Sequence, residues 1–451
     1  MSAWSIIQFD KLHAGFDFDA EHYHPERLLA WKKLSKSATK RVSDFAHEIE
    51  DLCDPNPVKP SFDLTAALGQ FLEFKGTSAA TSTKKLAIPG DVIVSRLRSY
   101  LHEVCVIPAR SPDFSPQLST EFIVLRSTSR FSAVWLASFI LSKPVQGILR
   151  CSQTGSNHPR FSAETLLSIP IPPPVEKIIV KLNELTEDAV LAFEKASYSY
   201  PEAEVELLDR IGWEALCKQP AELFYTRNID EVFKTERADA EFFQPRFTRL
   251  RSQLKKRGAQ MIGDVCTKIS RGVQPELFPD GEVVVVDSKS VRPVGVDSAS
   301  AERTSRAFHD QPQNAKGRVR YGDVLLNSTG RGTLGRATCY TLKEPGLCDN
   351  HVAILRPDTK VCHPLYLSLF LNSSAGFAQS EQFETGSSGQ IEIYPDHIAQ
   401  FLIFLPKQSN GKIDMAWQER LAAKVEAAAT AKAIARAKLA EAIAFVEAAV
   451  K

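Results

Sequence analysis

Two stretches of the chain place apolar residues at the spacing of an α-helix. In the first, after Pro174, apolar positions recur at steps of three and four and form one stripe: Ile178, Leu182, Leu185, Ala189 and Phe193. The second stripe lies in the C-terminal tail and is built largely from small residues: Leu421, Val425, Ala428, Ala431, Ala435 and Leu439. At ~1.5 Å per residue, a tail helix from Met415 to Lys451 is about 55 Å long. Small side chains on so long a stripe favour close packing against another helix.

Elsewhere the pattern is mixed. Short β-branched and aromatic runs predict strands at Val283–Val286, Val324–Leu326 and Val352–Leu355. They alternate with helical segments such as residues 363–379. A further helix is predicted from about Glu202 to Trp213, begun by Pro201 and followed by a polar linker. These elements predict an α+β fold.

The chain contains an internal repeat. Residues 4–27 align without gaps on residues 224–247 at a displacement of 220, and Asp10/Asp230, the Asp-Ala-Glu triplets at 19 and 239, and Pro25/Pro245 are identical. The strand beginning Gly90-Asp-Val matches Gly322-Asp-Val at 232, and the Thr-Gly-Ser triplets at 154 and 385 match at 231. Small changes of displacement are expected where loops differ in length between two copies of one fold.

The repeat predicts the domain organisation. Each copy closes on an apolar run that ends in proline, at Pro174 and Pro406, and a helix follows each of these stops. We therefore expect a first domain at 1–174, a helical spacer region at 175–218, a second domain at 219–407 and a long C-terminal helix at 408–451. Because the two helices are equivalent, we expect them to pair with each other in antiparallel fashion.

Composition narrows the class of protein. Lys plus Arg number 55 and Asp plus Glu 54, so the net charge of +1 gives no global signal for nucleic acid, and DNA contact would need local patches. The eight cysteines form no C-x-x-C pair and no metal-ligand spacing with histidine. No apolar run reaches the ~20 residues of a membrane span, and the first residues lack the features of a signal peptide. We expect a cytoplasmic protein with reduced thiols.

One motif resembles a dinucleotide-binding loop. Gly330-Arg-Gly332-Thr-Leu-Gly335 follows the strand at Val324, and Asp349 stands 19 residues after Gly330. The intervening residues are β-branched, aromatic and broken by Pro-Gly, so no helix is expected to start at the third glycine. The first copy keeps the strand and loses these glycines. We therefore predict that this loop is not a nucleotide site.

No other catalytic pattern is convincing. The chain has no G-x-x-x-x-G-K-[ST], H-E-x-x-H, G-x-S-x-G or Asn/Asp-Pro-Pro-Tyr/Phe motif. Asp280, Asp287 and Lys289 form a faint match to a Mg²⁺ nuclease. Residues 287–289 are equally those of a turn after a strand. The nuclease stays open as an alternative.

Polar loops at matched positions are the remaining candidates. Arg can bind guanine bidentately and Asn or Gln can bind adenine, so such loops on a rigid unit can read base edges. The predicted DNA-binding residues are Arg96, Arg98, Tyr100, Asn157, His158 and Arg160 in the first copy, and Arg271, Gln274, Asn327, Ser328, Thr329, Arg331, Arg336, Ser387 and Gln390 in the second. Basic helices near residues 32–41 and 249–257 can contact phosphates or simply face solvent.

The duplicated order of these features resembles the specificity subunit of type I restriction–modification systems. The resemblance covers nearly the whole chain and implies two target-recognition domains of mixed α/β structure, related by a pseudo-two-fold. Their long helices would form an antiparallel coiled coil whose length sets the gap between two half-sites.

The resemblance also implies a function in DNA methylation and phage defence. The chain would be non-catalytic and would read a bipartite target in double-stranded DNA. Because the loops after Val92 and Val324 diverge between the copies, we expect that target to be asymmetric. It would dock two methyltransferase subunits and, through them, restriction subunits. It would hold no cofactor itself, because S-adenosylmethionine, ATP and Mg²⁺ belong to the partners. A nuclease at Asp280, Asp287 and Lys289, or a coiled-coil scaffold without sequence readout, are the alternatives.

Overall fold

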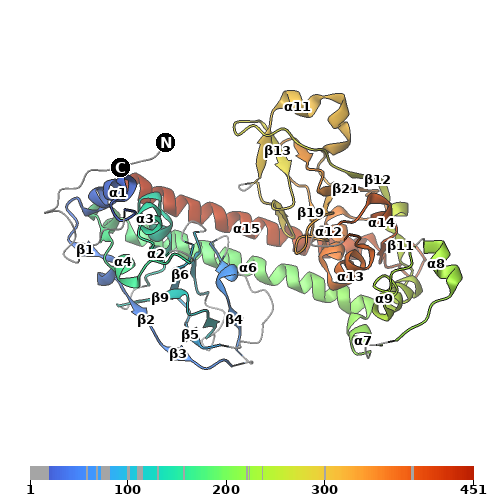
Figure 1. The fold of residues 1–451 in the computed structure, drawn as a ribbon, viewed down its shortest axis with the longest axis horizontal. Coiled ribbons are helices and arrows are strands. Elements are labelled where there is room, and N and C mark those ends of the chain that lie inside the picture. The colour runs from blue at the N-terminus through green and yellow to red at the C-terminus, as the bar shows by residue number, and fades with distance from the viewer. Residues whose placement is uncertain are drawn as a thin grey trace. The chain divides into compact units, whose positions relative to one another are not determined.

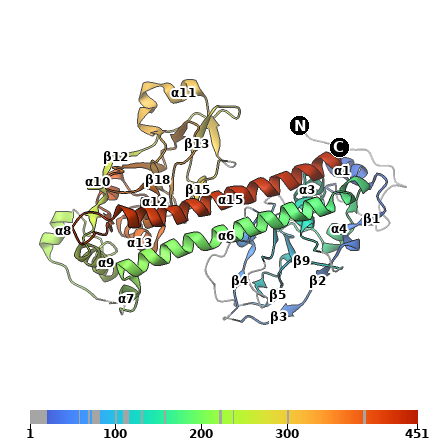
Figure 2. The same ribbon diagram turned by 180° about the vertical axis from the view of Figure 1, so that it is seen from behind.

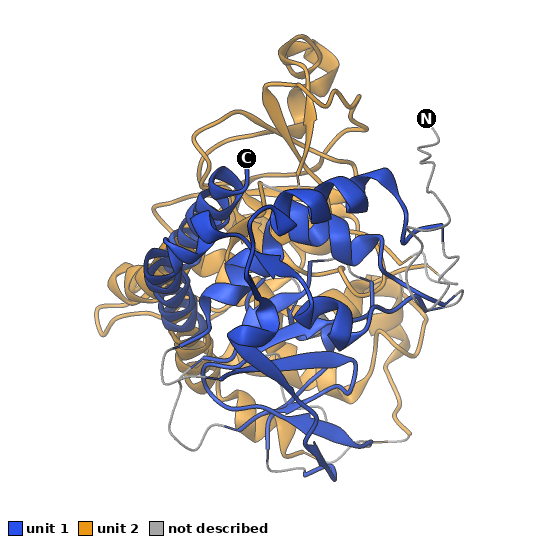
Figure 3. Cartoon of the chain, turned by 90° about the vertical axis from the view of Figure 1, so that its left-hand side faces the viewer, with its two compact units in different colours: residues 1–197, 431–451 blue, residues 198–430 orange. Residues whose placement is uncertain are grey.

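The chain forms two compact units (Figures 1 and 3). The computed structural model describes residues 20–56, 59–67, 70–72, 82–98, 102–108, 115–128, 132–155, 158–219, 222, 224–235, 237–298, 301–386 and 391–451. Unit 1 comprises residues 1–197 and 431–451, and unit 2 comprises residues 198–430. Each unit therefore includes part of the C-terminal helix.

Unit 1 combines two four-stranded sheets with short helices. Its elements are α1 (Pro25–Ser35), β1 (Lys40–Arg41), β2 (Ala46–Ile49), β3 (Leu52–Cys53), β4 (Ser61–Phe62), β5 (Lys84–Leu86), β6 (Val92–Ser95), β7 (Val104–Val106), β8 (Gln117–Leu118), β9 (Phe122–Ser127), α2 (Trp135–Leu141), α3 (Lys143–Arg150), α4 (Ala163–Leu167), β10 (Pro170–Ile171) and α5 (Pro173–Glu176). The sheets have the orders β2-β9-β6-β7 and β3-β5-β8-β4, and β1 pairs with β10.

Unit 2 repeats this plan with insertions. Its elements are α7 (Trp213–Cys217), α8 (Ile229–Thr235), α9 (Pro245–Lys256), β11 (Gln260–Met261), α10 (Ile262–Val265), β12 (Cys266–Arg271), β13 (Val283–Val286), β14 (Val291–Arg292), β15 (Gly295–Val296), β16 (Glu302–Thr304), α11 (Arg306–Asp310), β17 (Arg318–Val319), β18 (Val324–Asn327), β19 (Ala337–Cys339), β20 (Gly346–Cys348), β21 (Val352–Pro357), α12 (Pro364–Asn372), α13 (Ser374–Phe383), α14 (Pro395–Ala399) and β22 (Leu402–Ile403). The four-stranded sheets have the orders β12-β21-β18-β19 and β16-β13-β20-β17.

We call the sheets β2-β9-β6-β7 and β12-β21-β18-β19 the main sheets, and they have the same topology and register. Every pairing in both is antiparallel, and Val92 opposes Leu125 in unit 1 as Val324 opposes Leu355 in unit 2. Each sheet has two inner strands, and the one that follows the Gly-Asp pair, β6 or β18, is called the central strand below. All four of its residues are buried because both faces are covered. The tandem duplication predicted from the sequence is confirmed in the fold.

The second sheet is β3-β5-β8-β4 in unit 1 and β16-β13-β20-β17 in unit 2. Three strands of each are equivalent, and the fourth differs. In unit 1, β8 pairs parallel with β4 and antiparallel with β5, and in unit 2, β20 pairs parallel with β13 and antiparallel with β17. Unit 1 adds β3 beside β5, whereas unit 2 adds β16 beside β13. The two copies have therefore extended the same core at opposite edges.

The repeated Gly-Asp pair before the central strand has a structural role. Gly90 and Gly322 both have φ of +87°, a left-handed conformation that favours glycine. The following aspartate is 1% exposed in each copy and binds an arginine of the neighbouring strand through two hydrogen bonds, 2.9 and 2.7 Å for Asp91–Arg126 and both 2.7 Å for Asp323–Arg356. The motif thus fixes the start of the central strand.

The predicted helix at residues 363–379 is two helices. Ser373 separates α12 from α13 with extended backbone, φ −72° and ψ 163°, and its hydroxyl donates to the carbonyl of Phe370 at 2.6 Å. Ser142 separates α2 from α3 in unit 1, with the same 2.6 Å bond to Phe139. Serine favours a helix cap over a helix interior, which accounts for both breaks.

Two long helices connect these domains: α6 (Ile179–Ile211) and α15 (Met415–Ala449). The tail helix was predicted correctly. The prediction of a separate helix beginning at Pro201 is wrong, because α6 continues through this proline. Proline removes one backbone donor, but Ala196 and Ala203 on either side are buried, and tertiary packing keeps the segment helical.

The two long helices pair in antiparallel fashion, as predicted (Figure 2). In unit 1, Asp188 pairs with Lys438 at 3.1 Å. In unit 2, Glu206 pairs with Lys424 at 3.1 Å, and the Arg210 guanidinium lies 5.2 Å from the Trp417 ring. The residue numbers of the α15 partners fall as those of the α6 residues rise, so the two helices run in opposite directions.

Each unit takes half of each helix into its core. Leu182 and Leu185 of α6 share the unit 1 core with Leu439 and Val446 of α15. In unit 2 the second half of α6 and the first half of α15 do the same, through Ala203, Leu207, Ile211, Trp417, Leu421 and Val425. Among the described residues, no helix is long and apolar enough to cross a membrane.

Candidate nucleic-acid interface

In unit 1 the predicted loop residues gather around one carboxylate. Arg160 donates to Glu121 through Nε at 2.9 Å and Nη2 at 2.7 Å, and Nε of Arg96 lies 3.9 Å from the same carboxylate. Isolated bridges join residue 160 to Leu97 and Thr154, so the loop after β6 and the Thr-Gly-Ser loop are held together. This cluster is the Glu121 cluster below.

The other unit 1 candidates lie around this cluster. Arg98 is exposed and has φ of +53°, in the left-handed region that residues other than glycine seldom adopt. His158 is exposed, and its carbonyl accepts from Nη1 of Arg160 at 2.9 Å. Tyr100 and Asn157 lie outside the described residues.

Unit 2 builds a related cluster at the equivalent place. Isolated bridges join Glu392 to Thr329 and Thr385 in the way that they join residue 160 to its partners. The Glu392 carboxylate accepts from Nη2 of Arg271 at 2.8 Å and from the hydroxyl of Tyr394. The Arg271 guanidinium also lies 4.8 Å from the centre of the Tyr394 ring. We call this set the Glu392 cluster. Ser387 and Gln390 lie outside the described residues.

The two clusters carry opposite charges at equivalent positions. The matching bridges make Arg160 the counterpart of Glu392. The residue before the equivalent strand is Glu121 in unit 1 and His351 in unit 2. The same pair of backbone bridges therefore positions different side chains in the two copies. In unit 1 it positions Arg160, which binds Glu121, and in unit 2 it positions Glu392, which binds Arg271.

Asn327 and Ser328 are corrections to the predicted set. Both residues are 0% exposed. Nδ2 of Asn327 donates to the Ser288 carbonyl at 2.9 Å, and the Ser328 hydroxyl donates to the His351 carbonyl at 3.0 Å. These side chains hold the loops in place and offer no surface to a base edge, because the end of β18 is buried.

The remaining unit 2 candidates differ in their surroundings. Arg331 and Gln274 are exposed, and Arg336 is half-buried with Nη2 at 3.4 Å from the Gly332 carbonyl. Thr329 is half-buried, and its hydroxyl lies 2.8 Å from Nδ1 of His351. Arg331 and Gln274 therefore have the most accessible side chains of this set.

The glycine-rich loop is not a phosphate cradle. Gly330, Gly332 and Gly335 have φ of +94°, +88° and +81°, and the loop leads into strand β19 instead of a helix. A Cβ at Gly335 would lie 2.7 Å from the Ser380 hydroxyl oxygen, so close packing as well as backbone conformation requires glycine there. The prediction that no helix starts at this motif is confirmed.

The acidic residues proposed for a nuclease lie in two separate turns, one at each end of β13. Oδ1 of Asp287 accepts from the amides of Lys289 at 3.1 Å and Ser290 at 2.8 Å, directly after β13. Asp280 is exposed in the turn before that strand. This geometry matches the reading of residues 287–289 as a turn.

The basic helix of unit 2 uses arginines for packing. In α9, Nη1 of Arg251 donates to the Gln400 carbonyl at 3.2 Å, and its guanidinium lies 5.4 Å from the Phe383 ring. Burial lowers the pKa of Arg251. Arg257 donates to the Arg210 carbonyl at 3.0 Å. These two side chains are engaged within the unit.

Sequence reasoning missed the carboxylates that organise both clusters. Glu121 and Glu392 carry no motif, and attention to base-reading side chains favoured their arginine partners. The available signal was position: residue 121 immediately precedes the repeated strand, and residue 392 matches Arg160 at the displacement of 232 found for Gly90 and Gly322.

The Glu121 cluster should weaken in acid. Hydrogen bonding from Arg160 holds the pKa of Glu121 below its usual range. Because the pKa of Glu121 is lower in the folded than in the unfolded chain, its ion pair stabilises the fold at a pH above the pKa of the unfolded state. This stabilisation is lost as the pH falls through the pKa of the folded state. We expect a carbon-13 carboxyl NMR titration to show Glu121 titrating below ordinary glutamates, with Glu121→Gln providing the assignment.

Arg160→Met should return this titration toward the ordinary range, because it removes the hydrogen bonds while keeping an apolar stem. An identical titration in wild type and Arg160→Met would contradict the assigned pairing.

No protein-family model and no curated protein matches this chain. Three solved structures are similar to it over 91% of its length. One comes from a study of complex assembly and conformational transition in a type I R-M system (19% identity, 96% of that chain, TM-score 0.29). Another is the type I restriction-modification S subunit of M. genitalium (10% identity, 94% of that chain covered, TM-score 0.43). A third is the HsdS subunit of Thermoanaerobacter tengcongensis (17% identity, 94% of that chain covered, TM-score 0.27).

Proposed function

We propose that this chain is the DNA-recognition subunit of a type I restriction–modification complex and that it reads a bipartite, asymmetric target. One observation carries the proposal. The two units share sheet order, register and the buried Asp–Arg pair, whereas the Glu121 and Glu392 clusters at equivalent loops differ in charge and side-chain type. A constant scaffold with divergent loops is what two readers of two different half-sites require.

The exposed loop arginines are the best candidates for base contacts. Arg98 follows the central strand of unit 1, and Arg331 follows that of unit 2. Both are exposed, and a bidentate Arg–guanine contact contributes about 1–3 kcal/mol of discrimination. Arg160 and Arg271 already bind carboxylates, so we assign them to positioning the loops.

The proposal gives the chain partners and no reaction of its own. It would bind double-stranded DNA, methyltransferase subunits and, through them, restriction subunits, in the cytoplasm. S-adenosylmethionine, ATP and Mg²⁺ would act in those partners. Reading half-sites needs positioned hydrogen-bond donors and no reactive group in this chain.

The test is a genome-wide map of methylated adenines with and without the gene. We expect one bipartite motif to vanish on deletion. In strains carrying Arg98→Ala or Arg331→Ala, we expect one half of the motif to relax while the other half is kept. A methylation map unchanged by deletion would overturn the proposal.

The two other functions predict different results. A scaffold would bind DNA without sequence preference even beside the partner subunits. A nuclease would cut DNA as the purified chain with Mg²⁺, and cleavage would depend on Asp287.

A further inference from the structure

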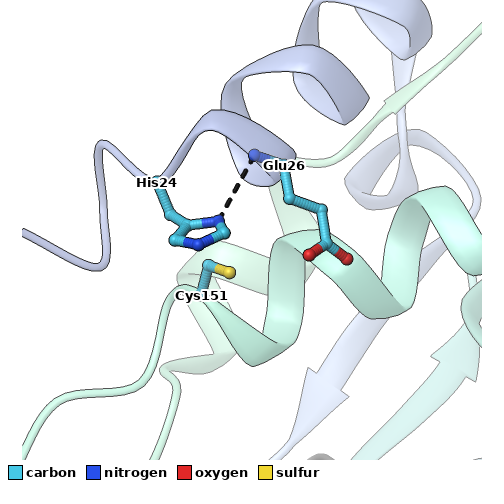
Figure 4. Close-up of side chains that lie close together, drawn as sticks. All are labelled: His24, Glu26 and Cys151. Carbon is cyan, nitrogen blue, oxygen red and sulfur yellow. Dashed lines mark hydrogen bonds between the residues drawn. The ribbon is translucent and has the colours of Figure 1, made fainter. Parts of the chain in front are cut away.

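A histidine, a carboxylate and a thiol meet in unit 1, where the start of α1 lies beside the end of α3 (Figure 4). His24 caps the N-terminus of α1, Glu26 lies in its first turn, and Cys151 directly follows α3. One possible ligand atom from each lies within 4.8 Å of the others. We propose that His24, Glu26 and Cys151 bind a zinc ion, with water as the fourth ligand.

The donor set selects the metal. Thiolate, imidazole and carboxylate are all zinc ligands, and three protein ligands with one water make a familiar tetrahedral site. Magnesium and calcium prefer oxygen donors and would leave the sulfur and nitrogen unused. Cys151 is only 3% exposed, so its sulfur is shielded from bulk solvent, whereas Glu26 is exposed and gives the ion a route of entry.

The local packing leaves room for the carboxylate to reach the thiol. Gly147 of α3 faces Glu26, and a Cβ at this position would lie 3.1 Å from Oε1 of Glu26. Arg150 competes with the ion for Glu26, whereas the His24 imidazole keeps its second nitrogen, Nε2, as a possible ligand. Arg150 pairs with the Glu26 carboxylate, and the Glu26 amide donates to Nδ1 of His24 at 3.3 Å, a long hydrogen bond.

The second copy shows that the fold does not require this set. The matching displacements of 220 and 231 place Gln244, Arg246 and Gln382 at the positions of His24, Glu26 and Cys151, and Ala378 at that of Gly147. There, Arg246 pairs with Glu381 at 2.5 Å, which reverses the charges of the Glu26–Arg150 pair. Unit 2 therefore closes the same junction with an ion pair and has no metal ligands at these positions.

Zinc at this junction would stiffen the base of a recognition loop. It would connect the start of α1 to the end of α3, three residues before Thr154. Thr154 and Arg160 exchange backbone hydrogen bonds of 2.9 and 3.0 Å that close the loop next to the Glu121 cluster. The site is independent of the proposed function, because its test needs no DNA.

Cobalt(II) provides the first measurement, as a spectroscopic substitute for zinc. Added to the untagged full chain, it should produce a thiolate-to-metal charge-transfer band that zinc removes by competition. Cys151→Ser should abolish the band, and Cys217→Ser, at an exposed cysteine, should leave it unchanged. No band, or a band lost only in Cys217→Ser, overturns the proposal.

Zinc affinity, measured by competition with a chromophoric chelator, tests the other ligands. His24→Asn keeps a good N-cap and Glu26→Gln keeps the shape of the side chain, so both should fold. Each should weaken binding by more than the roughly tenfold cost of losing an outer-shell partner. Unchanged affinity in both variants overturns the site.

Arg150→Gln is the most discriminating variant. It frees the Glu26 carboxylate from its ion pair, so zinc should bind several-fold more tightly than to wild type. If these residues merely pack, the variant gains no affinity, and that result also overturns the proposal.

Discussion

Arg356→Ala is expected to destabilise unit 2 by about 3–5 kcal/mol, the usual cost of leaving a buried charge without its partner. Asp323 is 1% exposed, and its carboxylate accepts two 2.7 Å hydrogen bonds from this arginine. Hydrogen bonding to Asp323 also raises the pKa of Arg356, as expected for a guanidinium held by a carboxylate. Urea denaturation measures the loss in the free energy of unfolding, and amide hydrogen exchange in β18 and β21 locates it in unit 2.

The duplication supplies a matched test and the same unit supplies a control. Arg126→Ala should destabilise unit 1 to a similar extent, because it leaves Asp91 equally buried. Arg306→Ala removes an exposed ion pair with Asp310, both side chains being 56% exposed, and should cost less than about 1 kcal/mol. Similar losses for Arg306→Ala and Arg356→Ala would show that the Asp323 pair contributes no more than a surface pair.

Leu439→Ala is expected to destabilise unit 1 although the residue lies near the C-terminus. Leu439 is 3% exposed in the unit 1 core, and truncating a buried leucine costs about 2–5 kcal/mol. Amide exchange should rise in β6 and β9 and stay unchanged in β18 and β21.

Leu421→Ala on the same helix should give the reverse pattern, because Leu421 lies in the unit 2 core. Ile434→Ala, at a position 47% exposed, should alter neither unit. Equal exchange in all four strands for both leucine variants would contradict the division of α15 between two cores.

The duplicated fold was predictable from sequence because it rests on local signals. Gly-Asp before a β-branched run, Pro-ended strands and helical stripes each specify their own element, and their recurrence at displacements of 220 to 232 links them. The continuation of α6 through Pro201 was not predictable, because packing at Ala196 and Ala203 decides it.

Prediction was less successful for the candidate site. Polar residue types identified Arg98 and Arg331, which are exposed, but also Asn327 and Ser328, which are buried. A loop sequence does not reveal which side chains turn inward. The organising carboxylates Glu121 and Glu392 depend on the meeting of segments distant in the chain, which spacing within one loop cannot show.

The division of α15 between two cores sets an order of folding during synthesis. Domains generally fold as they leave the ribosome, the N-terminal one first. Here the core of the N-terminal unit includes Ala435, Leu439, Ala442, Val446 and Val450, which are made only after the whole of unit 2. Among the described residues, unit 2 takes in α15 only as far as Thr430. The domain translated second can therefore complete its core first, while the domain translated first waits until the second half of α15 has been made.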